Sequence, residues 1–299
     1  MKGCNCGILN SYEGMQNMAR FTNQAQLRYG NAVANSNIAV GEILEVLSAT
    51  KTAVRTTYGQ NDHITYVISI VNSGNIAMTG LTLSDDLGAY AFGTGTVVPL
   101  TYVADTVRYY TNGVLQAAPA VNAGPPFTIN GISVPAGGNA TVVYEAALNE
   151  FAPLAAESTI GNTVTVSGGG ITPVTAQESI TAQSGPQLTI TKSVSPVPVT
   201  ENGALTYTFL IQNTGNTAAT PATGVVTDTF DPILSNIAVS FNGTTWAEPA
   251  NYSYNETTGE LVTQSGQVTV PAASFTQDAA TGAWTATPGV STLIVTGIV

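Results

Sequence analysis

The stretch ITYVISIVNSGN at residues 64–75 returns as LTYTFLIQNTGN at residues 205–216, which lies 141 positions later (64 to 205). In each copy an alternating run of large apolar side chains ends in Asn-Ser/Thr-Gly-Asn. Alternation with a period of two predicts a β-strand with one buried face, and the Asn- and Gly-rich ending predicts a turn. The chain of 299 residues is therefore expected to hold two copies of one β-rich domain.

Further segments extend this repeat on both sides of the quoted stretch. The matched pairs are Lys51 with Lys192, Asp85 with Asp228, and residues 140–144 (ATVVY) with residues 291–295 (STLIV). Several short strands separated by turn signals at this spacing predict an all-β fold, made of two tandem Ig-like β-sandwiches.

The matched strand, its turn and the Thr-Lys pair before it resemble the Ig-like repeat of bacterial and archaeal surface proteins that is known as the eleventh domain of unknown function. The resemblance covers residues 44–299, without the last part of the second copy. It implies a scaffold or adhesion role at a cell surface and not the catalysis of a metabolic step.

The two copies are expected to end differently. The first closes with IGNTVTV at residues 160–166 and a second strand-like stretch to about residue 183, whereas the second stops at Val299 before such an ending. A similar segment, FTNQAQL at residues 21–27, stands at the front of the chain and is followed by polar residues up to Val40. We expect a connector at 1–19, a donor segment at 20–43, a complete domain at 44–184 and a domain without its closing strand at 185–299.

A sandwich without its last strand exposes an apolar groove and a row of unpaired backbone groups. An extended segment of another chain can fill such a groove by strand addition. The expected donor strand carries Phe21, Asn23, Ala25 and Leu27 on one face. If the domains stack end to end, the donor lies two domains from its own groove, which favours a homopolymer. The alternative is a disordered tail at residues 1–40 and a second domain that closes by another route.

The chain has three lysines, and two of them, Lys51 and Lys192, occupy equivalent positions. Lysine, asparagine and a nearby acid are the parts of a self-formed isopeptide bond, and this set is similar to the chemistry of Gram-positive pilin and adhesin domains. Burial would favour a neutral amine and a protonated acid, so that the amine could attack the asparagine amide and the acid could pass a proton to the departing ammonia.

Two such bonds are expected. Within the first domain, Lys51 would join Asn162 with the help of Asp85, and between subunits Lys192 would join Asn23 of the next subunit with the help of Asp228. Close placement in a folded core would turn a slow reaction into a single feasible event. The alternative is an ordinary set of residues, in which the lysines face water, the aspartates end strands and the asparagines lie in turns.

Composition and cysteine placement limit the possible partners. The net charge is −11 with seven Lys plus Arg, which argues against nucleic acid or an anionic membrane surface as a partner. Cys4 and Cys6 lie before the predicted domains, where they suit cross-links between molecules or attachment to an anchor protein, with free thiols as the alternative. The first residues lack the apolar core of a secretory signal. An extracellular, cell-surface or spore-surface position without the general secretory route is expected.

The sequence offers little for an enzyme. His63 is the only histidine and is expected in a polar turn, and we find no Cys/His metal spacing, phosphate loop or dinucleotide motif. We therefore expect no catalytic turnover, no cofactor and no metal. The function that fits best is a structural subunit of a self-assembling, pilus-like fibre. The alternative is a monomeric adhesin or ligand-binding module whose Ig-like domains present loops to a sugar or a protein.

Overall fold

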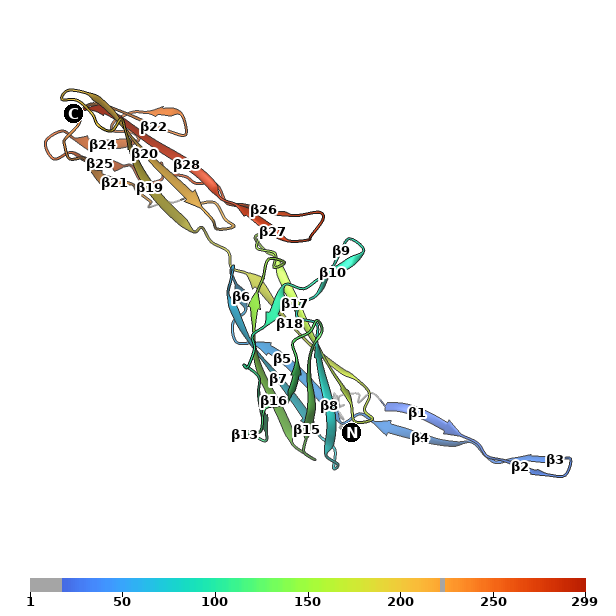
Figure 1. The fold of residues 1–299 in the computed structure, drawn as a ribbon. Coiled ribbons are helices and arrows are strands. Elements are labelled where there is room, and N and C mark those ends of the chain that lie inside the picture. The colour runs from blue at the N-terminus through green and yellow to red at the C-terminus, as the bar shows by residue number, and fades with distance from the viewer. Residues whose placement is uncertain (1–17, 221–223) are drawn as a thin grey trace, which may run out of the picture.

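The computed structural model of the chain describes residues 18–220 and 224–299, and in these residues the secondary structure consists of strands, with no helix. Figure 1 shows three parts in a row: a thin N-terminal arm, a first sandwich and a second sandwich. The predicted all-β fold of two tandem Ig-like sandwiches after an extended N-terminal segment is confirmed.

The first sandwich consists of two six-stranded sheets. One sheet has the order β13-β12-β16-β7-β5, with β11 also on β16, and the other has the order β14-β15-β8-β17-β18-β6. The strands of the first sheet are β5 (Leu47–Ala53), β7 (His63–Asn72), β11 (Leu100–Tyr102), β12 (Arg108–Thr111), β13 (Val114–Leu115) and β16 (Asn139–Leu148). Those of the second are β6 (Thr57–Tyr58), β8 (Met78–Asp85), β14 (Ala120–Asn122), β15 (Phe127–Val134), β17 (Thr159–Gly168) and β18 (Val174–Ala182). A separate hairpin joins β9 (Tyr90–Phe92) to β10 (Gly95–Val97).

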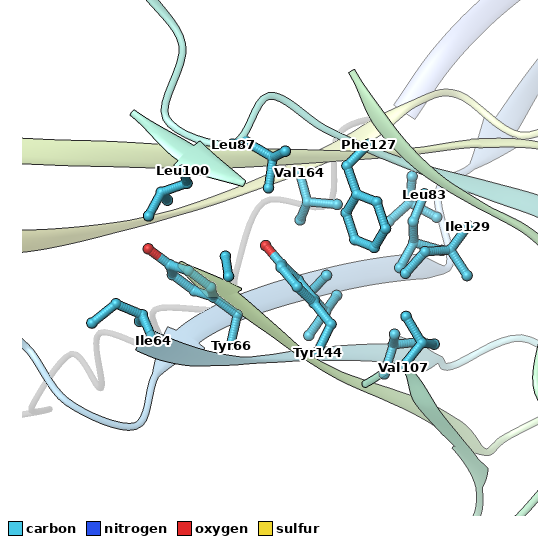
Figure 2. Close-up of a cluster of buried hydrophobic side chains, with 14 of the residues drawn as sticks. Ile64, Tyr66, Leu83, Leu87, Leu100, Val107, Phe127, Ile129, Tyr144 and Val164 are labelled. Carbon is cyan, nitrogen blue, oxygen red and sulfur yellow. The ribbon is translucent and has the colours of Figure 1, made fainter. Parts of the chain in front are cut away.

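Strand β7 shows how the sequence builds the core between these sheets. Ile64, Tyr66, Ile68 and Ile70 are fully buried, and the residues between them point away from the core. Figure 2 shows part of this cluster, where side chains of both sheets meet. Full burial of one isoleucine side chain contributes about 1.5–3 kcal/mol. The alternation in the opening stretch therefore places the strand correctly. His63 begins this strand and is not in the expected turn.

The second sandwich has a five-stranded sheet in the order β19-β20-β28-β22-β23 and a three-stranded sheet in the order β21-β25-β24. The first contains β19 (Leu188–Ser195), β20 (Ala204–Asn213), β22 (Ser235–Phe241), β23 (Thr244–Trp246) and β28 (Gly289–Ile298). The second contains β21 (Thr227–Thr229), β24 (Tyr252–Asn255) and β25 (Glu260–Thr263). A further hairpin joins β26 (Ser274–Gln277) to β27 (Trp284–Thr287). The core of the second sandwich includes Phe209, Phe230, Leu293 and Val295.

The two sandwiches differ at one side. Strand β8 is paired with β15 on one edge and with β17 on the other. Its counterpart β21 is paired with β25, and no strand of residues 18–220 or 224–299 pairs with its other edge. The neighbouring strand β19 is exposed along its whole length, with 51% of Leu188 and 53% of Ile190 accessible to solvent. In the described part of the chain, the second sandwich is therefore open where the first is covered by β17 and β18.

The N-terminal arm is a hairpin and not one continuous strand. Strand β1 (Met18–Asn23) pairs with β4 (Ala39–Leu44), and β2 (Gln26–Tyr29) pairs with β3 (Ala32–Asn35). Figure 1 shows this arm leaving the end of the first sandwich that is remote from the second sandwich. The expected donor strand is interrupted, because Ala25 lies between β1 and β2. The segment up to Val40, expected only to be polar, supplies the return strands.

Polar contacts hold the two sandwiches together. Asn216 donates hydrogen bonds to the carbonyls of Leu154 (3.1 Å) and Gln183 (3.0 Å). The hairpin β26–β27 reaches back to the first sandwich, where Trp284 Nε1 donates to the Tyr90 hydroxyl (3.1 Å). The Trp284 backbone N–H also donates to the Glu150 carbonyl (2.7 Å). These contacts fix the direction in which one sandwich continues into the next.

Candidate functional site: two lysine–aspartate pairs and an asparagine-bearing arm

The first sandwich brings Lys51, Asp85 and Asn162 together in its core. All three are buried, with 3%, 1% and 0% of their surface exposed. Lys51 Nζ donates a hydrogen bond to Asp85 Oδ2 at 2.7 Å. Asp85 lies opposite Val164 in the β8–β17 ladder, so Asn162, two residues along β17, faces the same side. Lys51 comes from the opposite sheet, and its long side chain crosses the space between the sheets.

Two tyrosines complete this cluster, and the sequence did not indicate either of them. The Tyr144 hydroxyl donates to Asp85 Oδ2 at 2.7 Å and accepts a hydrogen bond from Asn162 Nδ2 at 3.2 Å. Lys51 Nζ lies 4.9 Å from the centre of the Tyr66 ring. A lysine over an aromatic face gains a favourable electrostatic interaction that partly offsets its desolvation. The signal that was available was the aligned pair Tyr66 and Tyr207 inside the repeated stretch.

Burial shifts the pKa values of this pair. It lowers the pKa of the Lys51 amine, which the charge of Asp85 opposes. It also raises the pKa of the Asp85 carboxyl, which Lys51 and Tyr144 oppose. Both shifts favour a neutral amine and a protonated acid. These are the forms that nucleophilic attack on an amide requires, because a neutral amine has a free lone pair and an acid can donate a proton.

Two buried polar atoms of the cluster have no hydrogen-bond partner among the described residues: Asn162 Oδ1 and the Tyr66 hydroxyl oxygen. Burial raises the pKa of Tyr66, and a contact with the Asn162 amide opposes this rise. Tyr66 also stacks on Tyr144, whose hydroxyl contacts Asn162, so the three side chains form one cluster. A buried polar atom without a partner costs about 1–3 kcal/mol. Unpaired buried polar atoms of this kind are typical of a site whose geometry serves a function other than stability.

The second sandwich carries the equivalent lysine–aspartate pair in a more exposed setting. Lys192 on β19 forms an ion pair and hydrogen bond with Asp228 on β21, and the two side chains are 37% and 18% exposed. Lys192 Nζ lies 4.4 Å from the centre of the Tyr207 ring and 5.2 Å from that of Phe230. No asparagine side chain is hydrogen-bonded to this pair within the described residues. The structure therefore brings together two of the three predicted partners here.

An apolar hollow lies beside this second pair. Its volume is about 220 Å³, and its lining includes Leu188, Ile190, Ile211, Val225 and Val270. In the first sandwich the positions that match Leu188 and Ile190 are Leu47 and Ala49, which are half-buried and pack on the core. Ile171 and Ala176 of the β17–β18 hairpin pack on the same core. The hollow thus lies where a closing hairpin would cover the second sandwich.

The third predicted partner, Asn23, lies on the arm and is exposed. It faces Ala39 in the β1–β4 ladder, and Asn162 faces Glu178 in the β17–β18 ladder. The same offset of 139 positions relates β1 to β17 (23 to 162) and β4 to β18 (39 to 178). The β1–β4 ladder therefore has the same register as the hairpin that closes the first sandwich.

The pair next to Asn23 keeps this likeness. Phe21 lies opposite Gly41, and at the matching place Ile160 lies opposite Ile180. The Phe21 ring covers Gly41 so closely that a Cβ there would approach the ring to 2.2 Å. One large and one small residue thus take the place of two isoleucines. The pairing of β2 with β3 is shifted by one residue relative to that of β1 with β4. The register therefore matches that of β17 and β18 only for β1 and β4.

Several other predictions fall outside this site. Cys4 and Cys6 lie outside the described residues. In the described ranges no group of three or more His, Cys, Asp or Glu side chains is placed to hold a metal ion. A helix long and apolar enough to cross a membrane is also not found there. His63 contacts Glu145 at the surface, with 2.5 Å between Nδ1 and Oε1, away from the lysine cluster.

No family model and no curated protein matches the chain. Among solved structures it is similar to the major pilin subunit of Bacillus cereus, with 9% identity, a TM-score of 0.34, and coverage of 91% of this chain and 73% of that one. The pilus backbone of Streptococcus pneumoniae matches with 12% identity, a TM-score of 0.32, and coverage of 81% and 55%.

The C-terminal fragment of the major pilin of Streptococcus agalactiae matches with 11% identity, a TM-score of 0.32, and coverage of 48% of this chain and 58% of that one. The match thus spans little more than half of the two streptococcal pilins. A transglutaminase and a macrocyclisation enzyme also match. These three TM-scores are below 0.5, so the similarity carries no conclusion about function.

The two lysine–aspartate pairs predict different costs of substitution. Lys51→Met removes one partner of a buried hydrogen-bonded pair and leaves a polar atom of Asp85 without it, which is expected to cost about 1–3 kcal/mol of folding free energy. Lys192→Met removes one partner of a half-exposed pair and is expected to cost less than about 1 kcal/mol. Urea unfolding followed by circular dichroism measures both. Equal losses in the two variants would contradict the assignment of one closed and one open site.

Proposed function

We propose that this protein is a structural subunit of a self-assembling, pilus-like surface fibre, in which the arm of one subunit closes the second sandwich of its neighbour. The observation that carries the proposal is the shared register of the β1–β4 and β17–β18 ladders. A hairpin built like a closing hairpin stands at one end of the molecule. A sandwich with an open edge and an apolar hollow stands at the other.

Within β1 and β4, the shared register predicts where the arm residues would lie. Val164 is opposite Asp85 in the first sandwich, and Asn162 lies two residues before Val164 on the same strand. Asn23 would take the position of Asn162, next to Lys192. The proposed donor is a hairpin with two strands, which widens the expectation of a single donor strand.

The spacing after the arm supports an even string of sandwiches. From Asn162 to Lys192 there are 30 positions, and from Asn23 to Lys51 there are 28. A sandwich that follows an inserted arm would therefore start at nearly the same distance as the second sandwich starts from the β17–β18 hairpin. Insertion into the same molecule is disfavoured, because the arm leaves the first sandwich at the end remote from the second one (Figure 1).

Insertion would bury apolar surface on both partners. Phe21 and Leu27 of the arm are exposed, as are Leu188, Ile190 and Val225 around the hollow. Full burial contributes about 1.5–3 kcal/mol for each large apolar side chain. The free edge of β21 would gain backbone hydrogen bonds, which is how strand addition supplies affinity. These gains have to offset the cost of association and of ordering the arm.

Covalent bonds would then lock the assembly. In the first sandwich Lys51 Nζ would attack Asn162 Cγ and release ammonia, and between subunits Lys192 would join Asn23 in the same way, with Asp228 as the acid. The exposed Lys192–Asp228 pair would become buried when the arm covers it. Burial favours the neutral amine and acid, so insertion would itself activate the second site. The reaction occurs once for each bond, and the protein does not act as an enzyme.

The proposal also includes the attachment and the location of the fibre. Cys4 and Cys6 lie before the arm in the sequence, where they would cross-link subunits or attach the fibre to an anchor protein. We place the fibre outside the cell, on a cell or spore surface. No cofactor, nucleic acid or inserted membrane segment takes part in this proposal.

A denaturing gel tests the intersubunit bond. Protein boiled in detergent and reductant is expected to give a ladder of multimers, and Asn23→Ala is expected to give a monomer band only, because the arm then has no amide to attack. Asn37→Ala is the matched control: it lies on the same arm, its counterpart at position 176 is already alanine, and it should keep the ladder. A monomer band in all three samples, with single particles in negative-stain microscopy, would instead support the monomeric adhesin.

A mixing experiment tests the direction of assembly. Lys192→Met keeps a reactive arm but no reactive groove, and Asn23→Ala keeps the groove but no reactive arm. Each variant refolded alone is expected to give only monomer on the boiled gel. Refolded together, they should give a covalent dimer and nothing larger, because the dimer has no reactive end left. Mass spectrometry should find Lys192 of one variant joined to Asn23 of the other, and larger multimers would refute the head-to-tail scheme.

A further inference from the structure

The cluster in the first sandwich contains more than a lysine, an asparagine and an acid. One oxygen, Asp85 Oδ2, contacts both Lys51 Nζ and the Tyr144 hydroxyl, each at 2.7 Å. The same Tyr144 hydroxyl contacts Asn162 Nδ2 at 3.2 Å. Hydrogen bonds therefore connect the attacking nitrogen to the departing nitrogen through one carboxyl and one phenol. The other Asp85 oxygen is held by the backbone N–H of Leu87 at 3.0 Å, which fixes the orientation of the carboxyl.

The oxygen of the Asn162 amide is not engaged in this way. Asn162 Oδ1 has no hydrogen-bond donor within the described residues, and the Tyr66 hydroxyl, from the adjacent side chain, also lacks a partner there. Figure 2 shows the Tyr66 and Tyr144 rings side by side, with both hydroxyls pointing toward the strand that carries Val164. The two ring centres are 5.5 Å apart. Two phenols thus lie near the amide: the Tyr144 hydroxyl accepts a hydrogen bond from Asn162 Nδ2, and the Tyr66 oxygen lies near enough to the amide N–H group for it to oppose the rise in the pKa of Tyr66.

We propose that these tyrosines are catalytic residues with separate roles: Tyr144 delivers the proton to the departing nitrogen of Asn162, and Tyr66 stabilises the charge that develops on its oxygen. This inference rests on the proposed Lys51–Asn162 bond. It assigns two groups that the sequence did not indicate.

The step balances without any further reactant. Lys51 Nζ, as a neutral amine, forms a bond to Asn162 Cγ, and the amide oxygen gains negative charge to which the Tyr66 hydroxyl donates a hydrogen bond. The attacking nitrogen passes one proton to Asp85, while Asp85 passes one to Tyr144 and Tyr144 passes one to Asn162 Nδ2. The Cγ–Nδ2 bond then breaks. The new amide keeps one N–H on Lys51 Nζ, one ammonia departs, and Asp85, Tyr144 and Tyr66 return to their first states.

The second sandwich contains a natural comparison. Tyr66 lies opposite Tyr144 in the β7–β16 ladder, and Tyr207 lies opposite Val295 in the equivalent β20–β28 ladder. The intersubunit site therefore has Tyr207 as the equivalent of Tyr66, but it has no hydroxyl equivalent to that of Tyr144 to deliver a proton to the departing nitrogen. The intersubunit bond should form more slowly than the bond within the first sandwich. Arms would then have time to exchange between subunits before the fibre is locked.

Restoring the missing hydroxyl tests the proton delivery in the second sandwich. Val295→Tyr is compared with Val295→Phe, which adds the ring without the hydroxyl and controls for the extra volume in the core. General acid–base catalysis contributes roughly 10²–10⁴-fold. Refolded Val295→Tyr is expected to form the boiled-gel ladder at least about tenfold faster than Val295→Phe. Equal rates in the two variants would overturn the role given to Tyr144.

Removal of each hydroxyl tests the first sandwich. Full-length chains are synthesised in a short cell-free pulse, quenched in urea at intervals and digested, and the joined Lys51–Asn162 peptide is measured by mass. Tyr144→Phe and Tyr66→Phe should each slow its formation by about 10²-fold or more. Tyr109→Phe is the control, because the Tyr109 hydroxyl is bonded to the Ser133 carbonyl at 2.7 Å and lies outside the cluster.

The outcomes separate the two proposals. If the wild-type chain never forms the joined peptide, the proposed bond fails, and this inference fails with it. If the wild-type chain and both cluster variants form the peptide at one rate, the bond stands and the tyrosine roles are refuted. Urea unfolding of the three phenylalanine variants distinguishes loss of stability from loss of a reacting group. If a variant forms the peptide slowly but has the same unfolding midpoint as Tyr109→Phe, it has lost a reacting group and not the fold.

Discussion

The strand that carries the aspartate has to be covered on both edges before its ion pair leaves water. In the first sandwich β8 lies between β15 and β17, and this places the Lys51–Asp85 pair in the core. Removal of two charges from water costs several kcal/mol per ion, and attraction between them repays this only with good geometry and further hydrogen bonds. Tyr144 and the Leu87 backbone supply those bonds. The closing hairpin thus sets the polarity around the pair as well as completing the sheet.

The second sandwich shows the same pair without that cover. Lys192 and Asp228 meet as their counterparts do, yet water reaches both side chains. The difference lies in the neighbouring strands, since the lysine strand, the aspartate strand and the aromatic beneath the lysine are shared. Exclusion of water strengthens every electrostatic interaction inside a site. An inserted arm would therefore bring the asparagine and the dry surroundings in one event, which ties the chemistry to assembly.

The sequence predicted what depends on local pattern. Alternation located β7 and β20, and the matched spacing placed Lys51 beside Asp85, because a repeat carries equivalent residues to equivalent places. The return strand β4 was missed because its sequence, AVGEIL, places glycine and glutamate where alternation would need apolar residues. Tyr144 was missed because its counterpart is Val295, so a comparison of the copies gives no sign of its role. The hairpin β26–β27, which contacts Tyr90, lies at a place where the first copy has only the short turn after β15.

The hairpin form of the arm affects both the affinity of insertion and the register in which the arm inserts. A single extended segment has two unpaired edges, whereas in the arm β4 already satisfies one edge of β1. Less backbone freedom is then left to lose on insertion, and preorganisation of this kind reduces the cost of binding. Register matters more, because a slip of one residue turns every side chain of a strand to the other face. A slipped arm would point Asn23 away from Lys192. Only an arm in the register of β17 would become covalently fixed, and a misplaced arm would stay free to leave.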